Sequence, residues 1–305
     1  MEKIGFLFAG QGTQHVGMAR DLYDTFPESR AVFDKAEKIL GFEFKRRCFE
    51  GPEGMLKMTN ISQPAIVTSA IAAFEAFKNK SDLKPAYAAG LSLGEYSALI
   101  ASGGLALEDG IRLINKRSQL LEDAARKYPS KTVEVLDLLE EKVKAICSST
   151  QTRIVGYNCP GQTVISGTPE LIDKAADACL KAGAQQVVVL DVSAPLHSAL
   201  MFEASVELKM FMDNLPFSEL SEPVISNYTA RPEYKVVSTM ENLVYQMRFP
   251  VKWEESMRFI LAQGVTKFIE FGPGKVLKGL MRKIDPSARV VNIEKAEDIL
   301  NFANS

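Results

Sequence analysis

Hydrophobic and polar positions in the first part of the chain follow two spacings. The mainly apolar runs at 3–9 and 85–89 are typical of buried strands. Apolar positions three or four residues apart at 21–40, 64–77 and 108–127 are typical of helices. The first run ends in a glycine-rich segment, which favours a turn there. The pattern therefore predicts strands that alternate with helices.

Residues 128–192 follow a different pattern. It predicts a strand at 132–136, a helix at 139–148, strands at 153–158 and 162–166, a helix at 169–182 and a strand at 186–192. This βαββαβ order is that of the ferredoxin-like split motif. We therefore expect residues 128–196 to form a ferredoxin-like subdomain, inserted into a domain made of residues 1–127 and 197–305.

The last third of the chain returns to strands alternating with helices. Helices are expected at 200–215, 239–247, 253–263 and 276–284, and strands at 224–228, 267–271 and 289–293. Such alternation indicates a mainly parallel sheet with helices on both faces. The fold class expected is α/β.

Composition and charge exclude several classes of protein. The 305 residues include 36 Lys and Arg against 38 Asp and Glu, so a net charge of −2 gives no overall basic field for nucleic acid. No apolar run reaches the ~18 residues of a membrane-spanning helix. The first residues also lack the apolar stretch and cleavage site of a signal peptide. Neither nucleic acid nor membrane is an expected partner.

The cysteines bear on redox state and metal binding. Cys48, Cys147, Cys159 and Cys179 form no C-x-x-C pair, and no histidine lies at a zinc-binding spacing. We expect reduced thiols in a cytoplasmic protein, and no metal site.

The strongest chemical signal is the G-x-S-x-G pattern at 90–94, which falls between a predicted strand and a predicted helix. A sharp turn there would project the Ser92 hydroxyl outward, and glycines on both sides would let the backbone turn tightly. The helix that follows would offer free N–H groups to a developing oxyanion. A nucleophilic serine is the favoured interpretation; the alternative is an ordinary glycine-rich turn.

A nucleophilic serine needs a base, and the chain has only two histidines. His197 lies between a predicted strand and helix, where a loop residue can face a cleft, and the order Ser92 before His197 suits an α/β-hydrolase-like arrangement. His15 is the less favoured candidate. No carboxylate stands out as a third member of a triad. Asp191 is a candidate, and a backbone carbonyl could orient the imidazole instead.

Three other features have weaker interpretations. Residues 10–15 lack the third glycine of a dinucleotide-binding loop, and residues 272–275 lack the spacing and the Ser/Thr of a P-loop. Arg117, on the predicted 108–127 helix, is either a solvated charge or a ligand for a substrate carboxylate.

Six motifs occur in order along nearly the whole chain: FAGQGTQ at 8–14, GLSLGEY at 90–96, NCPGQTVISG at 158–167, SAPLHS at 193–198, FPVKW at 249–253 and GPGKVL at 272–277. Together they resemble the malonyl-CoA:acyl-carrier-protein transacylase family, relatives of the acyltransferase domains of fatty-acid and polyketide synthases. The resemblance implies an α/β-hydrolase-like domain with a ferredoxin-like insertion.

The resemblance also implies residue roles. They are Ser92 as the acylated nucleophile, His197 as base and then acid, the N–H groups of Gln11 and Leu93 as oxyanion donors, Arg117 as partner of the malonyl carboxylate, Gln246 as orienter of His197 through its main-chain carbonyl, and Asn158 in the cleft wall. The reaction implied is ping-pong transfer of malonyl from a coenzyme A thioester to the phosphopantetheine thiol of acyl carrier protein. It needs no metal or redox cofactor, and a monomer is expected.

The chain departs from the family pattern at three places. Leu91 stands where most members have histidine, Leu196 stands where many have phenylalanine, and residues 131–135 (KTVEV) replace a Gly-Ala-Met-Ala strand. We expect these positions to line or neighbour the cleft, so acyl selectivity is open. The alternatives are a thioester hydrolase, a polyketide-pathway acyltransferase with another acyl group, and a non-catalytic scaffold that binds carrier protein.

A basic cluster follows the last glycine-rich turn. Lys275, Lys278 and Arg282 fall near one face of the predicted helix, with Lys283 adjacent. Such a cluster could dock an acidic carrier protein, or it could be an ordinary solvated face.

Overall fold

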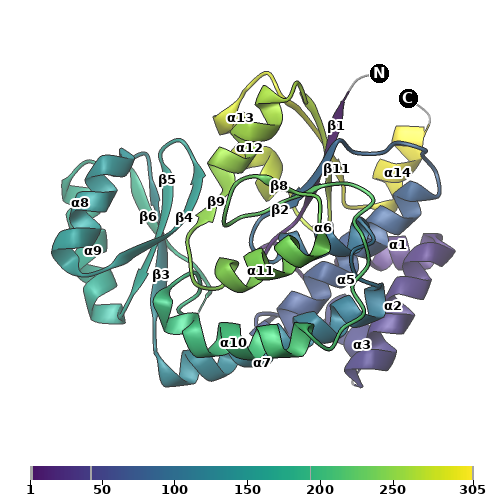
Figure 1. Cartoon of the computed structure of the whole chain (residues 1–305), viewed down its shortest axis with the longest axis horizontal. Helices are drawn as coiled ribbons and strands as arrows, with labels where there is room; N and C mark the ends of the chain where they lie inside the picture. Colours follow the sequence, from purple (N-terminus) through teal and green to yellow (C-terminus); the bar gives the residue numbers. More distant parts are fainter. Residues whose placement is uncertain (1–2, 42, 193, 304–305) are drawn as a thin grey trace.

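The main body of the protein is built on a six-stranded sheet with the strand order β11-β10-β1-β2-β7-β8 (Figure 1). The computed structural model describes residues 3–41, 43–192 and 194–303, so Ser193 of the 193–198 motif lies outside the described residues. The strands are β1 (Ile4–Phe8), β2 (Tyr87–Gly90), β7 (Val224–Ile225), β8 (Pro232–Glu233), β10 (Lys267–Phe271) and β11 (Arg289–Ile293). All neighbours pair in parallel except β7 and β8. The α/β class and the mainly parallel sheet are confirmed.

The central strand β1 is buried on both faces because its side chains alternate between two hydrophobic clusters. Ile4, Phe6 and Phe8 belong to the larger cluster, and Leu7 belongs to a second one on the other face. Helices α12 (Trp253–Ala262) and α13 (Val276–Ile284) contribute to the second cluster. A continuous apolar run is therefore what this position in a parallel sheet requires.

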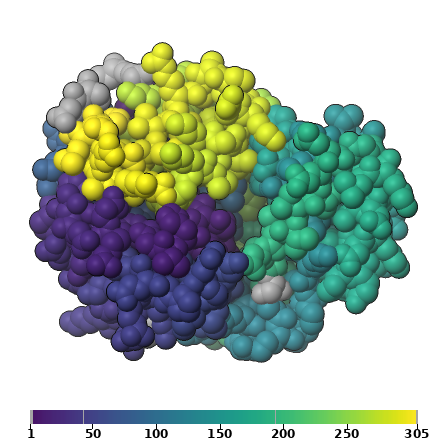
Figure 2. Space-filling model, turned by 180° about the vertical axis from the view of Figure 1, so that it is seen from behind, coloured from purple at the N-terminus to yellow at the C-terminus, as the bar shows by residue number. Residues whose placement is uncertain are grey.

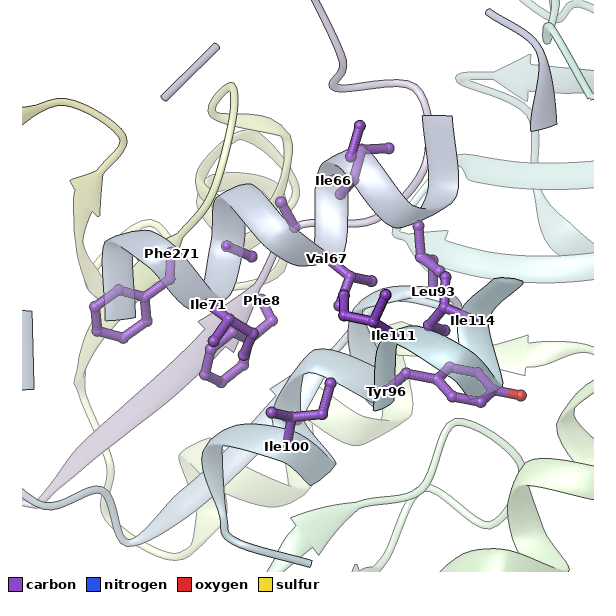
Figure 3. Packing of buried hydrophobic residues seen from close by; sticks show 14 of the residues in the cluster. Phe8, Ile66, Val67, Ile71, Leu93, Tyr96, Ile100, Ile111, Ile114 and Phe271 are labelled. Carbon is purple, nitrogen blue, oxygen red and sulfur yellow. The ribbon is translucent and has the colours of Figure 1, made fainter. Parts of the chain in front are cut away.

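Helix α5 (Thr59–Lys78) is buried along most of its length and packs between the sheet and other helices (Figure 3). Its residues Ile66, Val67 and Ile71 lie in the same cluster as Phe8 and Phe271, whose ring centroids are 5.5 Å apart. A helix that is apolar on all sides belongs in an interior. It therefore forms the centre of the larger core.

The other helices surround this core. They are α1 (Arg20–Thr25), α2 (Pro27–Leu40), α3 (Phe44–Glu50), α4 (Glu53–Leu56), α6 (Gly94–Ala101), α7 (Leu107–Lys127), a short 3-10 turn at Ala199–Met201, α10 (Phe202–Met212), α11 (Val236–Gln246) and α14 (Ala296–Ala303). The single helix expected at 21–40 is wrong, because Phe26 is extended between α1 and α2. The residue before a proline is disfavoured in helical conformation, and Pro27 begins α2.

A second sheet forms a lobe beside the main body (Figures 1 and 2). Its elements follow in the order β3 (Lys131–Leu136), α8 (Glu140–Thr150), β4 (Arg153–Cys159), β5 (Gln162–Gly167), α9 (Pro169–Lys181) and β6 (Gln186–Val189). The strand order is β6-β3-β5-β4-β9, and β3 to β6 pair antiparallel. The expected βαββαβ order is confirmed. Strand β9 (Val251–Lys252), from a distant part of the chain, was not expected and pairs parallel with β4.

Two expected strands end early. β6 stops at Val189 rather than residue 192, because the Val192 N–H turns back to the Leu190 carbonyl as the chain returns to the main body. β7 stops at Ile225 rather than residue 228, because the Ser226 carbonyl closes a turn with the Ala230 N–H. None of the helices in the described part of the chain is long and apolar enough to cross a membrane.

Candidate active site

Ser92 lies in a tight turn between strand β2 and helix α6. Its φ of 51° is left-handed, a strained conformation for a serine that is typical of functional sites. A Cβ on Gly90 would overlap the backbone of Gly94, and a Cβ on Gly94 would overlap the Phe8 carbonyl oxygen. Both positions therefore require glycine. The strand–turn–helix context expected for the motif is confirmed.

The structure brings Ser92 and His197 into direct contact. The Ser92 Oγ lies 2.9 Å from the His197 Nε2, and the His197 Nδ1 lies 2.6 Å from the main-chain carbonyl oxygen of Gln246. Because a carbonyl only accepts, we assign the imidazole proton to Nδ1, which leaves Nε2 free to accept from the serine hydroxyl. Burial lowers the pKa of His197 to about 4, although the bond to Gln246 opposes the shift. The imidazole is therefore neutral near pH 7 and available as a base.

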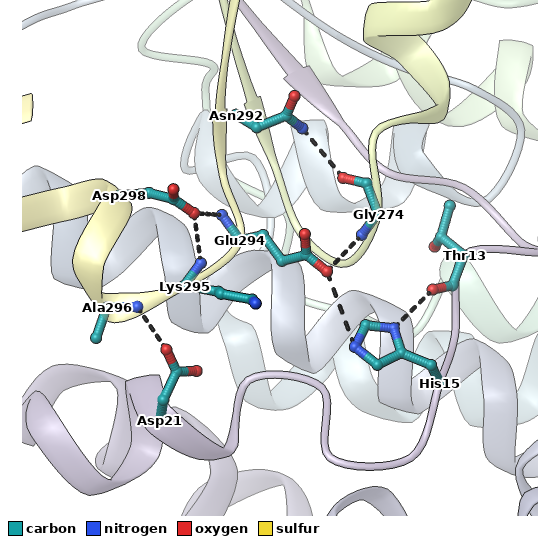
Figure 4. Close-up of polar contacts among 9 residues, drawn as sticks. All are labelled: Thr13, His15, Asp21, Gly274, Asn292, Glu294, Lys295, Ala296 and Asp298. Atoms are coloured by element: carbon teal, nitrogen blue, oxygen red, sulfur yellow. Dashed lines mark hydrogen bonds and ion pairs between the residues drawn. The ribbon is translucent and has the colours of Figure 1, made fainter.

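The other imidazole and the candidate third carboxylate lie elsewhere. His15 is half exposed, with Nδ1 3.4 Å from the Thr13 carbonyl oxygen and Nε2 3.8 Å from Glu294 (Figure 4). Asp191 is exposed, and the His197 Nδ1 is already bonded to the Gln246 carbonyl. A main-chain acceptor therefore occupies the place of a triad acid.

Two backbone N–H groups are available beside Ser92. Gly10 packs so closely on the Leu91 carbonyl that a Cβ there would overlap it, which sets Gln11 next to the serine turn. Leu93 is the N-cap of α6. Within the described residues, neither N–H donates a hydrogen bond. Both can donate to a developing oxyanion.

A cavity of about 290 Å³ opens between the two sheets in front of Ser92. Its wall includes Gln11, Leu91, Ser92, Thr132, Glu134, Asn158, Gln162, Leu196, His197, Val276 and Leu280. The expectation that the positions departing from the family pattern line the cleft is thus met at Leu91, Leu196 and Glu134. The Glu134 Oε1 accepts from the Asn158 Nδ2 at 2.9 Å and the Gln162 Nε2 at 2.6 Å. The cleft wall therefore carries a carboxylate.

Arg117 is fully buried on α7, so its interpretation as a solvated charge is wrong. Its Nη1 donates to the Gln63 Oε1 at 2.8 Å, and the guanidinium lies 5.2 Å from the centre of the Tyr96 ring. Its Nε and Nη2 have no hydrogen-bond partner among the described residues. Buried donors of a charged group are costly to leave unpaired, so this arrangement suits an anion that arrives with the substrate.

Arg117 is connected to the cavity wall. The Gln63 that accepts from it donates in turn from Nε2 to the Gln11 Oε1, at 3.1 Å. The positive charge of Arg117 also contributes to the lowered pKa of His197. The buried cation and the serine–imidazole pair therefore belong to one site.

The basic cluster lies at the edge of this site. Lys275, Lys278, Arg282 and Lys283 are all exposed, and none forms an ion pair with a described residue. The same helix, α13, turns Val276 and Leu280 into the cavity wall. The cluster thus lies on an element that borders the cleft.

Sequence reasoning missed the residues that hold the turn in place. The Asn227 side chain accepts from the Ser92 N–H at 2.6 Å and donates to the Gly90 carbonyl at 2.8 Å. Gln63 was also missed, although a glutamine in a helix of mainly small and apolar residues is a usable signal. Asn227 follows a short strand and carries no such signal.

Comparison with known proteins gives the family. Residues 5–297 match the acyl transferase domain family. The chain belongs to this acyltransferase family. The Malonyl CoA-acyl carrier protein transacylase of Bacillus subtilis (strain 168) is 37% identical over 304 residues, 98% of this chain and 96% of that protein. The family expected from the six motifs is confirmed.

Solved structures of other acyltransferases agree with this one over their whole length. The malonyl-transacylase in a complex with its type II PKS acyl-carrier protein (PlMCAT:AntF) has a TM-score of 0.96 at 32% identity, with 99% of each chain covered. MCAT from Streptococcus pneumoniae has a TM-score of 0.92 at 35% identity, with 99% of each chain covered.

Proposed function

We propose that this acyltransferase transfers a malonyl group from malonyl-CoA to the phosphopantetheine thiol of acyl carrier protein. The product supplies fatty-acid chain elongation. The observation that carries the proposal is the buried Arg117, which has two unpaired donors and is linked through Gln63 and Gln11 to the wall of the cavity in front of Ser92. A neutral acyl chain would leave these donors unpaired, whereas a malonyl carboxylate would accept from them. The names of the similar proteins support the same substrate and partner.

The first half-reaction acylates the enzyme. The Ser92 hydroxyl gives its proton to the His197 Nε2 while the Oγ bonds to the thioester carbon. The N–H groups of Gln11 and Leu93 stabilise the resulting oxyanion. When the carbon–sulfur bond breaks, imidazolium returns the proton to the coenzyme A sulfur. Malonyl-Ser92 remains.

The second half-reaction runs through the same groups. The carrier-protein thiol gives its proton to the His197 Nε2, and its sulfur attacks the ester carbon. The bond to the Ser92 Oγ breaks, and the oxygen takes the proton back. Neither step uses a metal or a redox cofactor.

We assign the main body, residues 1–127 and 197–305, to the α/β-hydrolase-like type, and residues 128–196 to the ferredoxin-like type. A nucleophile turn at the carboxyl end of a parallel strand supports the first assignment. The βαββαβ order and the antiparallel pairing of its four strands support the second. We further propose a cytoplasmic monomer, and the four free, buried cysteines are consistent with a reducing compartment.

Intact-protein mass spectrometry tests the function directly. After brief incubation with malonyl-CoA, the enzyme is expected to gain one malonyl group that maps to Ser92, and holo acyl carrier protein is expected to remove it. Ser92→Ala is expected to gain none. An adduct lost to water in the absence of carrier protein would instead favour the thioester hydrolase.

Charge reversal at Lys278 and Arg282 tests the docking surface. We expect the K278E/R282E variant to lower kcat/KM for carrier protein about tenfold at low salt, with a smaller loss at high salt. Charge complementarity mainly raises the rate at which two proteins associate, and salt screens this effect. Acylation by malonyl-N-acetylcysteamine, which has no phosphates, should be unchanged.

The matched control for this test is K80E/K84E, two exposed lysines before β2, at the end of the sheet away from Ser92. Equal losses in both variants would show a general charge effect and would remove the docking role from α13.

Glu134 gives a test of acyl selectivity. Its carboxylate shares the cleft with the incoming acyl group, so it repels a malonyl carboxylate and not an acetyl group. Glu134→Gln is expected to raise kcat/KM for malonyl-CoA a few-fold relative to acetyl-CoA. Because both thioesters carry the same coenzyme A phosphates, their ratio isolates the effect on the acyl group. An unchanged ratio would show that Glu134 does not act on acyl selectivity.

A further inference from the structure

A buried carboxylate, which none of the steps above uses, lies next to the residues that hold the serine–imidazole pair. Glu95 follows the G-x-S-x-G motif on α6 and is fully buried. Its Oε2 accepts from the Gln246 Nε2 at 2.7 Å and from the Asn227 N–H at 3.0 Å. Its Oε1 has no partner among the described residues. A buried carboxylate with so few donors is costly and invites a functional explanation.

The two partners of Glu95 are the residues that hold the catalytic pair. Gln246 accepts from the His197 Nδ1 through its main chain, and its side-chain Nε2 also donates to the Ser92 carbonyl at 3.0 Å. Asn227 binds the Ser92 N–H through its side chain. One carboxylate oxygen thus joins the segment that orients the base to the segment that fixes the nucleophile turn.

We propose that Glu95 is a positioning residue for acyl transfer. As a carboxylate it holds Gln246 and Asn227 in place. The Gln246 carbonyl and the Ser92 turn then keep the imidazole and the serine hydroxyl within hydrogen-bonding distance of each other. The His197 Nδ1 donates to the Gln246 main-chain carbonyl rather than to a carboxylate. Glu95 acts on the imidazole indirectly, because it binds the side chain of Gln246. The inference rests on the activation of Ser92 by His197 in the proposed function, and not on the identity of the acyl group.

The ionisation of Glu95 gives this role a pH dependence. Burial raises the pKa of Glu95 to about 7, while its bonds to Asn227 and Gln246 oppose the shift. The charged groups that face it are Glu233 of β8, which raises its pKa, and Arg117 of α7, which lowers it. Below pH 7 the group takes up a proton and accepts more weakly from Gln246. His197, with its pKa near 4, does not change charge in that range.

The experiment measures the pseudo-first-order rate of Ser92 phosphonylation by an excess of a fluorophosphonate probe between pH 5.5 and 8.5. This rate constant is independent of malonyl chemistry and of the fraction of folded enzyme. For the wild-type chain we expect the rate to fall as pH decreases through about 7. For Glu95→Gln we expect a flat profile, at a level about tenfold below the wild type at pH 8.5. For Glu95→Ala, which removes the acceptor altogether, we expect a larger loss.

The matched control is Glu270→Gln. Glu270 is also buried, with its pKa raised to about 7 by burial, but it binds the N–H groups of Leu277 and Lys278 rather than the catalytic pair. Its replacement is expected to leave the fall near pH 7 in place. A fall near pH 7 that persists in Glu95→Gln, or that disappears in Glu270→Gln, would overturn the proposal. Normal probe kinetics without malonyl transfer would contradict the proposed function alone.

Discussion

Replacing His197 by alanine is expected to slow the acylation of Ser92 by a factor on the order of 10³–10⁴. The imidazole is the described group in contact with the Ser92 hydroxyl, and its Nε2 is the atom that takes the proton. Rapid-quench measurement of malonyl-Ser92 formation would report the loss directly. Binding of malonyl-CoA should change little, because Arg117 and the cavity wall remain.

The paired control is His15→Ala, which removes the other histidine of the chain. Because His15 lies against Thr13 and Glu294 rather than Ser92, its loss is expected to change acylation by less than about threefold. A large loss in His15→Ala together with a small one in His197→Ala would reverse the assignment of the base.

Replacing Arg117 by alanine is expected to lower kcat/KM for malonyl-CoA by a factor of about 10²–10³, because a buried carboxylate loses its cationic partner. Acetyl-CoA has no such carboxylate, so its transfer should be unchanged or increased. The ratio of the two substrates on one protein preparation is the measurement, and it is insensitive to the amount of folded enzyme.

Arg117→Lys separates charge from geometry. Lysine keeps the positive charge but lacks the planar fork of donors that binds both the Gln63 side chain and a carboxylate. We expect an intermediate loss for malonyl transfer. Equal losses for malonyl and acetyl transfer in Arg117→Ala would contradict the assigned role and leave Arg117 a structural residue.

The elements that sequence predicted well are those whose spacing is undisturbed over their length. β1 is a continuous apolar run in the middle of a covered sheet, β10 has apolar residues on either side of Glu270, and α7 has one apolar face. The failures have local causes. Pro27 divides one predicted helix into two, and the two-residue strand β9 is defined by its pairing with β4 rather than by its own pattern.

The residues of the site divide in the same way, into those that a local pattern indicates and those that only the fold brings together. Ser92 could be found because its glycines reflect a local turn, and His197 because there are only two histidines to weigh. The burial of Arg117 could not be predicted from the sequence, because a charged residue on an amphipathic helix usually faces solvent. Asn227 and Glu95 are partnered with residues more than 130 positions away, so no local pattern shows what they bind, although Glu95 itself lies in the GLSLGEY motif.

The short segment from Gln246 to Lys252 has two attachments. Its first residue supplies the acceptor for the His197 imidazole, and its last two form β9, which is hydrogen-bonded to β4 of the smaller lobe. If a bulky group in the cleft tilted that lobe, β9 would therefore move with it and shift the Gln246 carbonyl that orients His197. The residue that orients the base and the strand that joins the smaller lobe thus belong to one short segment.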